Sequence, residues 1–521
     1  MKVARIKSPV IVACAAACVA ILGIVSALSP ETAAQSRFVA GTLPAGWPSV
    51  ARTLTITISL GLLWLARGLA RRKRRAWQLA VALVIASAIT HLVKGLDYEE
   101  AIGSFAALLL LLKTRRQFAA PGDPESVRPL IQVTLAILVV AGIAALRFNG
   151  TVAYSDRFDD ALAIAIGILA ARALILWLRP IAERAAHIPD DRRRAEALVH
   201  EHGTDSLAYF SLRRDKSIFF SESRRSFLAY RVVAGTAIIA GDPIGDPEER
   251  SELLAEFRRV AHTKAWRVAI AGASGDGLAD YGQLGFRAIY LGDEAFVRPA
   301  AFSLDGRPIR KVRQSVTRLE KAGYRVEFAA PDEIGEARRE ELRSVSEEWR
   351  GRWPERGFTM AMDGLFAYPD AVLALAIGPD GALGGFMQLV PAPASGGYSL
   401  ASMRRRRDTP NGLMEFLIVE TIGWAREREV SELSLNFSVF AEYLSGDRRF
   451  LRMLLLKGDR LFQLERLYSF NRKFFPEWRR RYFCFERWTD LPLAAFAYMH
   501  AESLLTPPGP WASKSTDLTA R

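Results

Sequence analysis

Cysteine and histidine are scarce in this chain of 521 residues, which has three cysteines and six histidines. Cys14 and Cys18 lie one helical turn apart in an apolar stretch, where they act as small hydrophobic side chains, and Cys484 stands alone. This usage excludes a disulfide framework and suits a reducing compartment. His200 and His202 form the one close pair, without a cluster of cysteines or carboxylates beside it, so we expect no metal site.

An acidic excess is also absent. The chain has 70 Lys and Arg against 56 Asp and Glu, and its formal net charge is +14. This balance favours polyanionic partners such as tRNA or anionic lipid headgroups, and the alternative is a basic surface that is merely solvated. The length predicts two or more domains, because a single hydrophobic core seldom grows so large.

Apolar runs in the first third predict about six transmembrane helices. Pro9–Leu28 could instead be a signal peptide, but the further spans favour a retained helix. The run at residues 101–112 is the shortest, so it could be tilted or re-entrant. The remaining runs are residues 50–70, 76–93, 129–146 and 161–178.

Basic clusters at residues 71–75, 113–116 and 179–194 fall on alternate connections between these runs. Such connections are cytoplasmic by the positive-inside rule, so both termini should lie inside. We therefore predict a multi-pass domain of the cell membrane at residues 1–180, a charged linker at 181–205 and a cytoplasmic C-terminal region.

After the linker, short β-rich runs alternate with amphipathic helices, which is typical of an α/β or α+β domain. The order strand, loop, helix, strand is the heart of the GNAT acyltransferase fold, and it occurs twice. We expect an all-α transmembrane bundle followed by an α/β (α+β) tandem GNAT domain. Its parts are a first GNAT-like subdomain at 206–304, a basic connecting helix at 305–324, a second, catalytic GNAT-like subdomain at 325–492 and a C-terminal tail at 493–521.

Two basic segments are candidates for binding polyanions. The connecting helix carries Arg310, Lys311 and Arg313 and could contact nucleic acid or a membrane surface, or be a solvated linker helix. The loop at residues 404–412 stands where coenzyme-A-dependent GNAT enzymes have spaced glycines, but here it begins with four arginines. It therefore argues against coenzyme A, and we expect no cofactor and another acyl donor.

Several motifs follow one another along the second part of the chain. They are PNGLMEFL at 410–417, SLNFSVF at 434–440 and QLERLYSFNRKFFPEWRRRY at 463–482, with shorter ones at 241–243, 310–324 and 356–361. This ordered series resembles the synthase domain of phosphatidylglycerol lysyltransferases, the multiple peptide resistance factor family. The similarity covers roughly residues 207–492 and is closest to the actinobacterial form fused to a lysyl-tRNA synthetase, which we do not expect in this chain.

The resemblance implies transfer of an amino acid, lysine in this family, from aminoacyl-tRNA to the glycerol headgroup of phosphatidylglycerol. The product lowers the negative charge of the membrane and gives resistance to cationic peptides. The implied partners are lysyl-tRNA or another aminoacyl-tRNA, phosphatidylglycerol and an anionic membrane, and a homo-oligomer is possible. The alternatives are acyl transfer to another lipid or cell-wall precursor, and a catalytically degenerate transport or regulatory protein.

The motifs supply the candidate site residues. Arg404, Lys473 and Arg481 suit phosphate or oxyanion contact, and Glu415 suits proton transfer or binding of the donor's α-amino group. The rival interpretation is that Glu415 only caps or pairs on its helix. Candidate substrate-binding residues are Asn411, Asn436, Glu465, Tyr468 and Asn471, together with Arg310, Lys311 and Arg313 of the basic helix.

One position departs from the family pattern. The family has Asp-x-x-Arg ahead of the Pro-Asn-Gly loop, whereas this chain has Ala401-Ser-Met-Arg404. Either a neighbour such as Glu415 or Asp408 replaces the carboxylate, or the donor specificity has shifted, or activity is reduced or lost.

Overall fold

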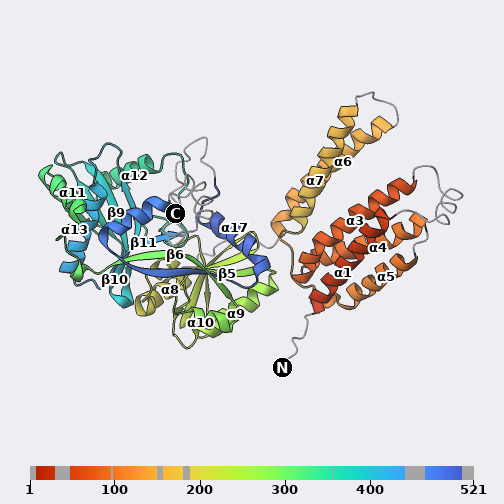
Figure 1. Ribbon diagram of the computed structural model, residues 1–521, viewed down its shortest axis with the longest axis horizontal. Helices are drawn as coiled ribbons and strands as arrows, with labels where there is room; N and C mark the ends of the chain where they lie inside the picture. The colour runs from red at the N-terminus through yellow and green to blue at the C-terminus, as the bar shows by residue number, and fades with distance from the viewer. Residues whose placement is uncertain are drawn as a thin grey trace. The chain divides into compact units, whose positions relative to one another are not determined.

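The computed structural model describes residues 8–29, 47–95, 98–148, 156–179, 183, 188–355, 357–439 and 464–506 (Figure 1). The chain divides into two units. The first comprises Met1–Ala182 with Val260–Trp266, and the second comprises Glu183–Arg259 with Arg267–Arg521.

Helices occupy every apolar run predicted in the first third of the chain. The helices α1, α3, α4 and α5 pack around a common apolar core that includes Val12, Leu62 and Leu111, whereas α6 and α7 pack on each other. Within the described residues, two segments are long and apolar enough to cross a membrane, Pro9–Leu28 and Thr53–Ala70. The bounds are α1 Ser8–Leu28, α3 Trp47–Ala70, α4 Arg74–Gly95, α5 Tyr98–Lys113, α6 Val127–Phe148 and α7 Asp156–Trp177.

The basic connections of this unit meet one another. Arg74 N donates to Ala120 O at 2.9 Å, and Lys73 Nζ donates to Leu178 O at 2.8 Å. Arg179 forms an ion pair with Asp123 at 3.1 Å. The connection before α4, the one after α5 and the end of α7 therefore lie at the same end of the unit.

The second unit is built on one twelve-stranded sheet with the order β1-β2-β3-β5-β12-β6-β11-β10-β9-β8-β7, and β4 pairs with β2. The strands are β1 Ser217–Phe220, β2 Ser226–Val233, β3 Thr236–Ala240, β4 Ile244–Gly245, β5 Arg267–Ala273, β6 Arg287–Val297, β7 Arg325–Ala329, β8 Val372–Ile377, β9 Leu383–Ala392, β10 Gly397–Arg405, β11 Leu433–Val439 and β12 Glu477–Phe485. The helices are α8 Pro189–His202, α9 Arg250–Thr263, α10 Leu278–Gln283, α11 Arg310–Lys321, α12 Glu336–Arg350, α13 Leu413–Glu427, α16 Leu464–Asn471 and α17 Leu491–Ala501.

Each half contains a parallel pair of strands joined through a helix. In the first half β3 runs parallel to β5 through α9, and in the second β10 runs parallel to β11 through α13. The halves also exchange strands, because β12 from the end of the chain lies between β5 and β6, and β6 pairs with β11. The exchange leaves no open edge between the halves, so one continuous sheet runs through both.

Two segments predicted to lie outside the folded halves belong to their core. The range 181–205, predicted as a linker, contains α8, whose Ala195, Leu198 and Val199 are buried in the core of the first half. The range 493–521, predicted as a tail, contains most of α17, which packs on β2, β3 and β5. Both helices are short and rich in alanine or in charged residues, so their sequences show no clear apolar periodicity that would predict a buried face.

Candidate functional site

The strands β10 and β11 pair briefly and then part, so that an opening in their hydrogen-bond ladder follows the first two residue pairs. Their parallel pairing covers Tyr398 with Leu433 and Ser399 with Ser434. Beyond it, the Nδ2 group of Asn436 donates to Leu400 O at 3.1 Å and to Met360 O at 2.9 Å. Asn436 has φ +74°, which asparagine tolerates better than most residues. Its side chain therefore holds the parting strands in place.

A β-bulge in β10 explains the three-residue spacing of the Asp-x-x-Arg position. The register with β9 shifts between Leu400 and Ser402. As a result Leu400 and Met403 pack against the same core, whereas Ala401 belongs to the core on the other face. Since side chains alternate along a strand, Arg404 lies on the face of Ala401. The bulge thus places two residues that are three apart in sequence on the same face of β10.

Arg404 has a carboxylate partner, which the sequence analysis did not single out. Its Nη2 group donates to Glu355 Oε1, and its side chain is 11% exposed whereas that of Glu355 is 42% exposed. Glu355 also pairs with Arg350 at 3.2 Å. Glu355 follows α12 in an irregular segment, so no periodic pattern points to it. Among the residues that the structure describes, the carboxylate that contacts Arg404 is therefore neither Glu415 nor Asp408.

Glu415 and Lys473 form a second charged pair. Lys473 Nζ lies 2.6 Å from Glu415 Oε1, and their side chains are 43% and 16% exposed. Glu415 stands in the first turn of α13, where the preceding Gly412 has φ +93°. Lys473 also lies over the ring of Phe470, 4.9 Å from its centroid. The two predicted catalytic residues are thus in contact, and the ion-pair partner of Glu415 lies outside its own helix α13.

The segment beside the opening is fixed by the C-terminal part of the chain. Glu502, one residue after α17, accepts hydrogen bonds from Phe358 N at 2.7 Å and Thr359 N at 3.0 Å. Arg213 donates to Ala361 O at 2.6 Å. The predicted tail therefore positions the motif at residues 357–361, whose Met360 carbonyl accepts from Asn436.

Comparison with known proteins identifies the second unit. A family model described as "Phosphatidylglycerol lysyltransferase, C-terminal" matches residues 196–485. The chain belongs to this family. It is 32% identical over 491 residues to the lysylphosphatidylglycerol biosynthesis bifunctional protein LysX of Rhodococcus jostii, covering 85% of this chain and 44% of that protein. The identity to LysX of Mycolicibacterium gilvum is 33% over 500 residues, covering 85% and 45%. The chain thus spans less than half the length of these relatives.

Solved structures share the fold. One, described as the C-terminal domain (DUF2156) of a lysylphosphatidylglycerol synthetase from Agrobacterium fabrum, is 26% identical with a TM-score of 0.54, covering 60% of this chain and 97% of that one. The structure of L-PGS from Bacillus licheniformis is 24% identical with the same TM-score of 0.54, covering 62% and 98%. The second unit therefore has the mixed α/β fold of these structures.

Arg481, predicted to act with Arg404, Glu415 and Lys473, has different neighbours. It is buried on β12 and donates to Asp205 at 2.7 Å, to Glu294 at 2.7 Å and to Ser206 Oγ at 2.8 Å. Burial by itself would lower the pKa of Arg481, but Asp205 and Glu294 raise it. The guanidinium of Arg481 is thus engaged by two carboxylates and links β12 to β6 and to the segment after α8.

Three predicted binding residues lie on or next to α16. Asn471 is buried and donates to Leu435 O at 3.1 Å, and Tyr468 packs on Trp478 with ring centroids 4.9 Å apart. Both contacts support the fold beside the opening. Glu465 lies on α16, and its side chain is outside the described part of the structure.

The basic helix α11 lies over the Pro-Asn-Gly loop. Arg318 donates to the carbonyl oxygen of Asn411, and a Cβ on Gly412 would lie 2.6 Å from Ser315 Cβ, so the approach requires glycine. Arg310 and Lys311 are exposed, whereas Arg313 donates to Gly306 O at 3.2 Å. The exposed cations of α11 therefore stand next to the predicted donor loop.

Proposed function

We propose that this protein transfers a lysyl group from lysyl-tRNA to the glycerol hydroxyl of phosphatidylglycerol. The observation that carries the proposal is the Arg404–Glu355 pair beside the opening held by Asn436, in a chain that belongs to the phosphatidylglycerol lysyltransferase family. An aminoacyl ester is already activated, so aligning the donor with the hydroxyl and stabilising the oxyanion are the main tasks.

Residues of the second half align the donor with the hydroxyl and stabilise the oxyanion. The Arg404 guanidinium donates to the carbonyl oxygen as it becomes an oxyanion, and Glu355 orients that guanidinium. Glu415 accepts the proton of the attacking glycerol hydroxyl and passes it to the ribose oxygen that leaves, so that the proton balance closes. Lys473 holds the Glu415 carboxylate in position through their 2.6 Å contact.

The exposed cations of α11 support a tRNA contact at the entrance to this site. Arg310 and Lys311 face solvent, and the helix touches the Pro-Asn-Gly loop through Arg318. Contacts to phosphates release counterions, so affinity falls steeply with salt. Replacing Arg310 and Lys311 with Gln should weaken tRNA binding. It should also reduce the slope of the logarithm of affinity against the logarithm of salt concentration by about one per lost phosphate contact. An unchanged slope would remove α11 from the interface.

The first unit is proposed as a multi-pass domain of the cell membrane that holds the second unit on the cytoplasmic side. Two long apolar helices and the gathering of the basic connections at one end support this arrangement. Alkaline phosphatase fused after residues 45 and 152 should be active, and after residues 73 and 117 inactive. The reverse pattern would place the second unit outside.

A vesicle assay tests the function directly. The full chain in phosphatidylglycerol vesicles is mixed with radiolabelled lysyl-tRNA or alanyl-tRNA, and lipids are extracted. Lysyl-phosphatidylglycerol should form, and Arg404→Gln should abolish it. No aminoacylated lipid with any charged tRNA would refute the proposal, and a product on another lipid would redirect the acceptor assignment.

A further inference from the structure

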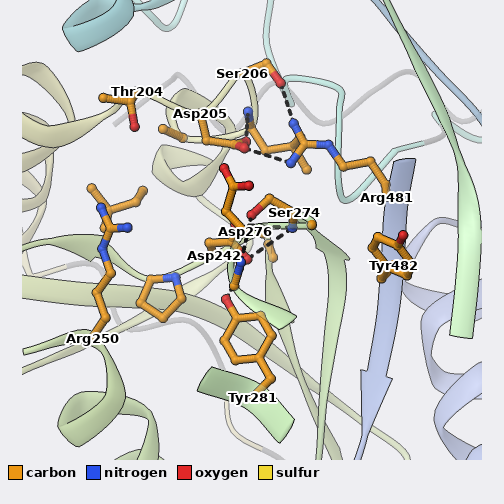
Figure 2. A pocket seen from close by; sticks show the side chains of 18 of the residues that line it. Thr204, Asp205, Ser206, Asp242, Arg250, Ser274, Asp276, Tyr281, Arg481 and Tyr482 are labelled. Carbon is orange, nitrogen blue, oxygen red and sulfur yellow. Dashed lines mark hydrogen bonds and ion pairs between the residues drawn. The ribbon is translucent and has the colours of Figure 1, made fainter. Parts of the chain in front are cut away.

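A cavity of about 560 Å³ opens in the first half, where the parallel strands β3 and β5 end (Figure 2). Its walls are the loop after β3, the loop after β5, the start of α9, the segment after α8 and part of β12. Open α/β sheets bind ligands at the carboxyl ends of their strands, and small-molecule sites have volumes of roughly 300–1,000 Å³. The position corresponds to the parting of β10 and β11 in the second half.

Most cations in this cavity are already paired. Arg481 is bound by Asp205, and Arg479 pairs with Glu432 through two hydrogen bonds of 3.0 and 2.7 Å. These two arginines could neutralise an anionic ligand only if their ion pairs broke. They therefore line the cavity without offering a free positive charge.

Arg250 is the exception among the described cations that line the cavity. The Nε group of Arg250 is buried without a hydrogen-bond partner, and Nη2 reaches only Gly245 O, at 3.5 Å. In the described part of the chain it meets no carboxylate. Figure 2 shows its side chain projecting into the cavity. A buried guanidinium donor without an acceptor costs free energy, which an anionic ligand group would offset.

Carboxylates surround the same space. Asp276 has no hydrogen bond or ion pair within the described ranges, and Figure 2 shows it turned into the cavity. Asp242 accepts from Tyr281 Oη at 2.5 Å and from Ser274 N at 3.2 Å. Burial, followed by the nearby charge of Asp205, raises the pKa of Asp242. A cationic ligand group beside Asp242 and Asp276 would relieve this repulsion.

We propose that this cavity binds a free basic amino acid such as L-lysine, with its carboxylate on the Arg250 guanidinium and its ammonium groups on Asp276 and Asp242. A planar carboxylate matches the fork of an arginine. A phosphate dianion would be repelled by the carboxylates of Asp242 and Asp276, and a diamine would leave Arg250 without an acceptor. No bond forms or breaks at this site, so it is a second ligand site separate from the transfer of a lysyl group.

Isothermal titration calorimetry tests the site, with the full chain in detergent and with neither tRNA nor phosphatidylglycerol. The probes are L-lysine, cadaverine, which lacks the carboxylate, and glycerol 3-phosphate, which lacks the ammonium groups. L-Lysine should bind, and the two partial probes should bind at least tenfold more weakly. Arg250→Gln and Asp276→Asn should each raise the dissociation constant for L-lysine at least tenfold.

Arg259→Gln is the matched control, because Arg259 is an exposed residue of the same helix outside the cavity. It should bind L-lysine as the wild type does, and thermal unfolding should show that all variants are folded. Three results would overturn the proposal: no binding at millimolar L-lysine, equal binding by Arg250→Gln, or loss of binding in Glu415→Gln instead, which would move the ligand to the second half. Loss of lysyl transfer with L-lysine binding intact would refute only the proposed function.

Discussion

Replacing Glu355 with Gln tests whether this residue supplies the carboxylate that Ala401 lacks. The change keeps the size and one acceptor oxygen but removes the charge that faces Arg404. Charge-assisted hydrogen bonds contribute about 1.5–3 kcal/mol, but Glu355 is 42% exposed, so solvent screening reduces the expected loss to about 1–2 kcal/mol. In the transition state this corresponds to a roughly five- to thirty-fold lower rate of lysyl transfer.

The vesicle assay with lysyl-tRNA measures this rate, and the reduction should appear in kcat, because Glu355 orients a group that acts on the oxyanion. Glu340→Gln is the control, since it removes a carboxylate from an exposed 3.0 Å ion pair with Arg343 on α12. Its activity should match that of the wild type.

The double variant Glu355→Gln, Ala401→Asp should recover most of the lost rate. The β-bulge places residue 401 on the same face of β10 as Arg404, so the new carboxylate can reach the guanidinium. Two results would refute this reasoning. One is a wild-type rate for Glu355→Gln. The other is a gain of more than tenfold from Ala401→Asp alone, which would mean that the natural protein lacks a functional replacement.

The charged groups around the site give three more expectations. Glu415→Gln and Lys473→Met should lower transfer by similar factors, and the double variant should lose little more, because the two side chains act as one pair; additive losses would contradict this. Glu502→Ala should lower the unfolding temperature, since it frees three donors of Phe358 and Thr359 and costs about 2 kcal/mol, and an unchanged temperature in detergent would contradict it. Burial lowers the pKa of Lys216 to about 7, so the folded protein binds fewer protons than the unfolded chain between about pH 7 and 10.5, and stability should rise with pH there. Lys216→Met should remove this rise in thermal unfolding from pH 7 to 9, and an equal slope in both proteins would refute the assignment.

Much of the second unit follows from its sequence. The order strand, loop, helix, strand, which is predicted twice, is found as β3, α9 and β5 in the first half and as β10, α13 and β11 in the second. Apolar periodicity and the glycine before α13 are local signals, so a single sequence carries them. The exchange of β12 has no local signal, because pairing between distant strands depends on the whole sheet.

In the candidate site, too, some residues lie in local sequence motifs and others are brought in only by tertiary contacts. Arg404, Glu415 and Asn436 lie in motifs that sequence alone reveals, and the structure places all three near the parting of β10 and β11 or at the start of α13. Glu355 and Glu502 come from an irregular segment and from a predicted tail. Only tertiary contacts bring their carboxylates to Arg404 and to Phe358.

Arg481 shows why charge within a motif is ambiguous. Its guanidinium and the hydroxyl of Ser434 both bind the buried Glu294, and Ser434 Oγ accepts from Asn436 N at 3.3 Å. Arg481 lines the cavity of the first half, whereas Asn436 holds the opening of the second. One hydrogen-bonded group, made of residues from β6, β11 and β12, therefore connects the cavity of the first half with the place where β10 and β11 part. The buried ion pair of Arg481 and Glu294 fixes the register of β12 and β6. Loss of either residue would leave the charge of the other one buried without compensation. Arg481 is thus held by partners of the first half, whereas Arg404 and Glu415, the groups proposed to act on the substrate, lie on the second half.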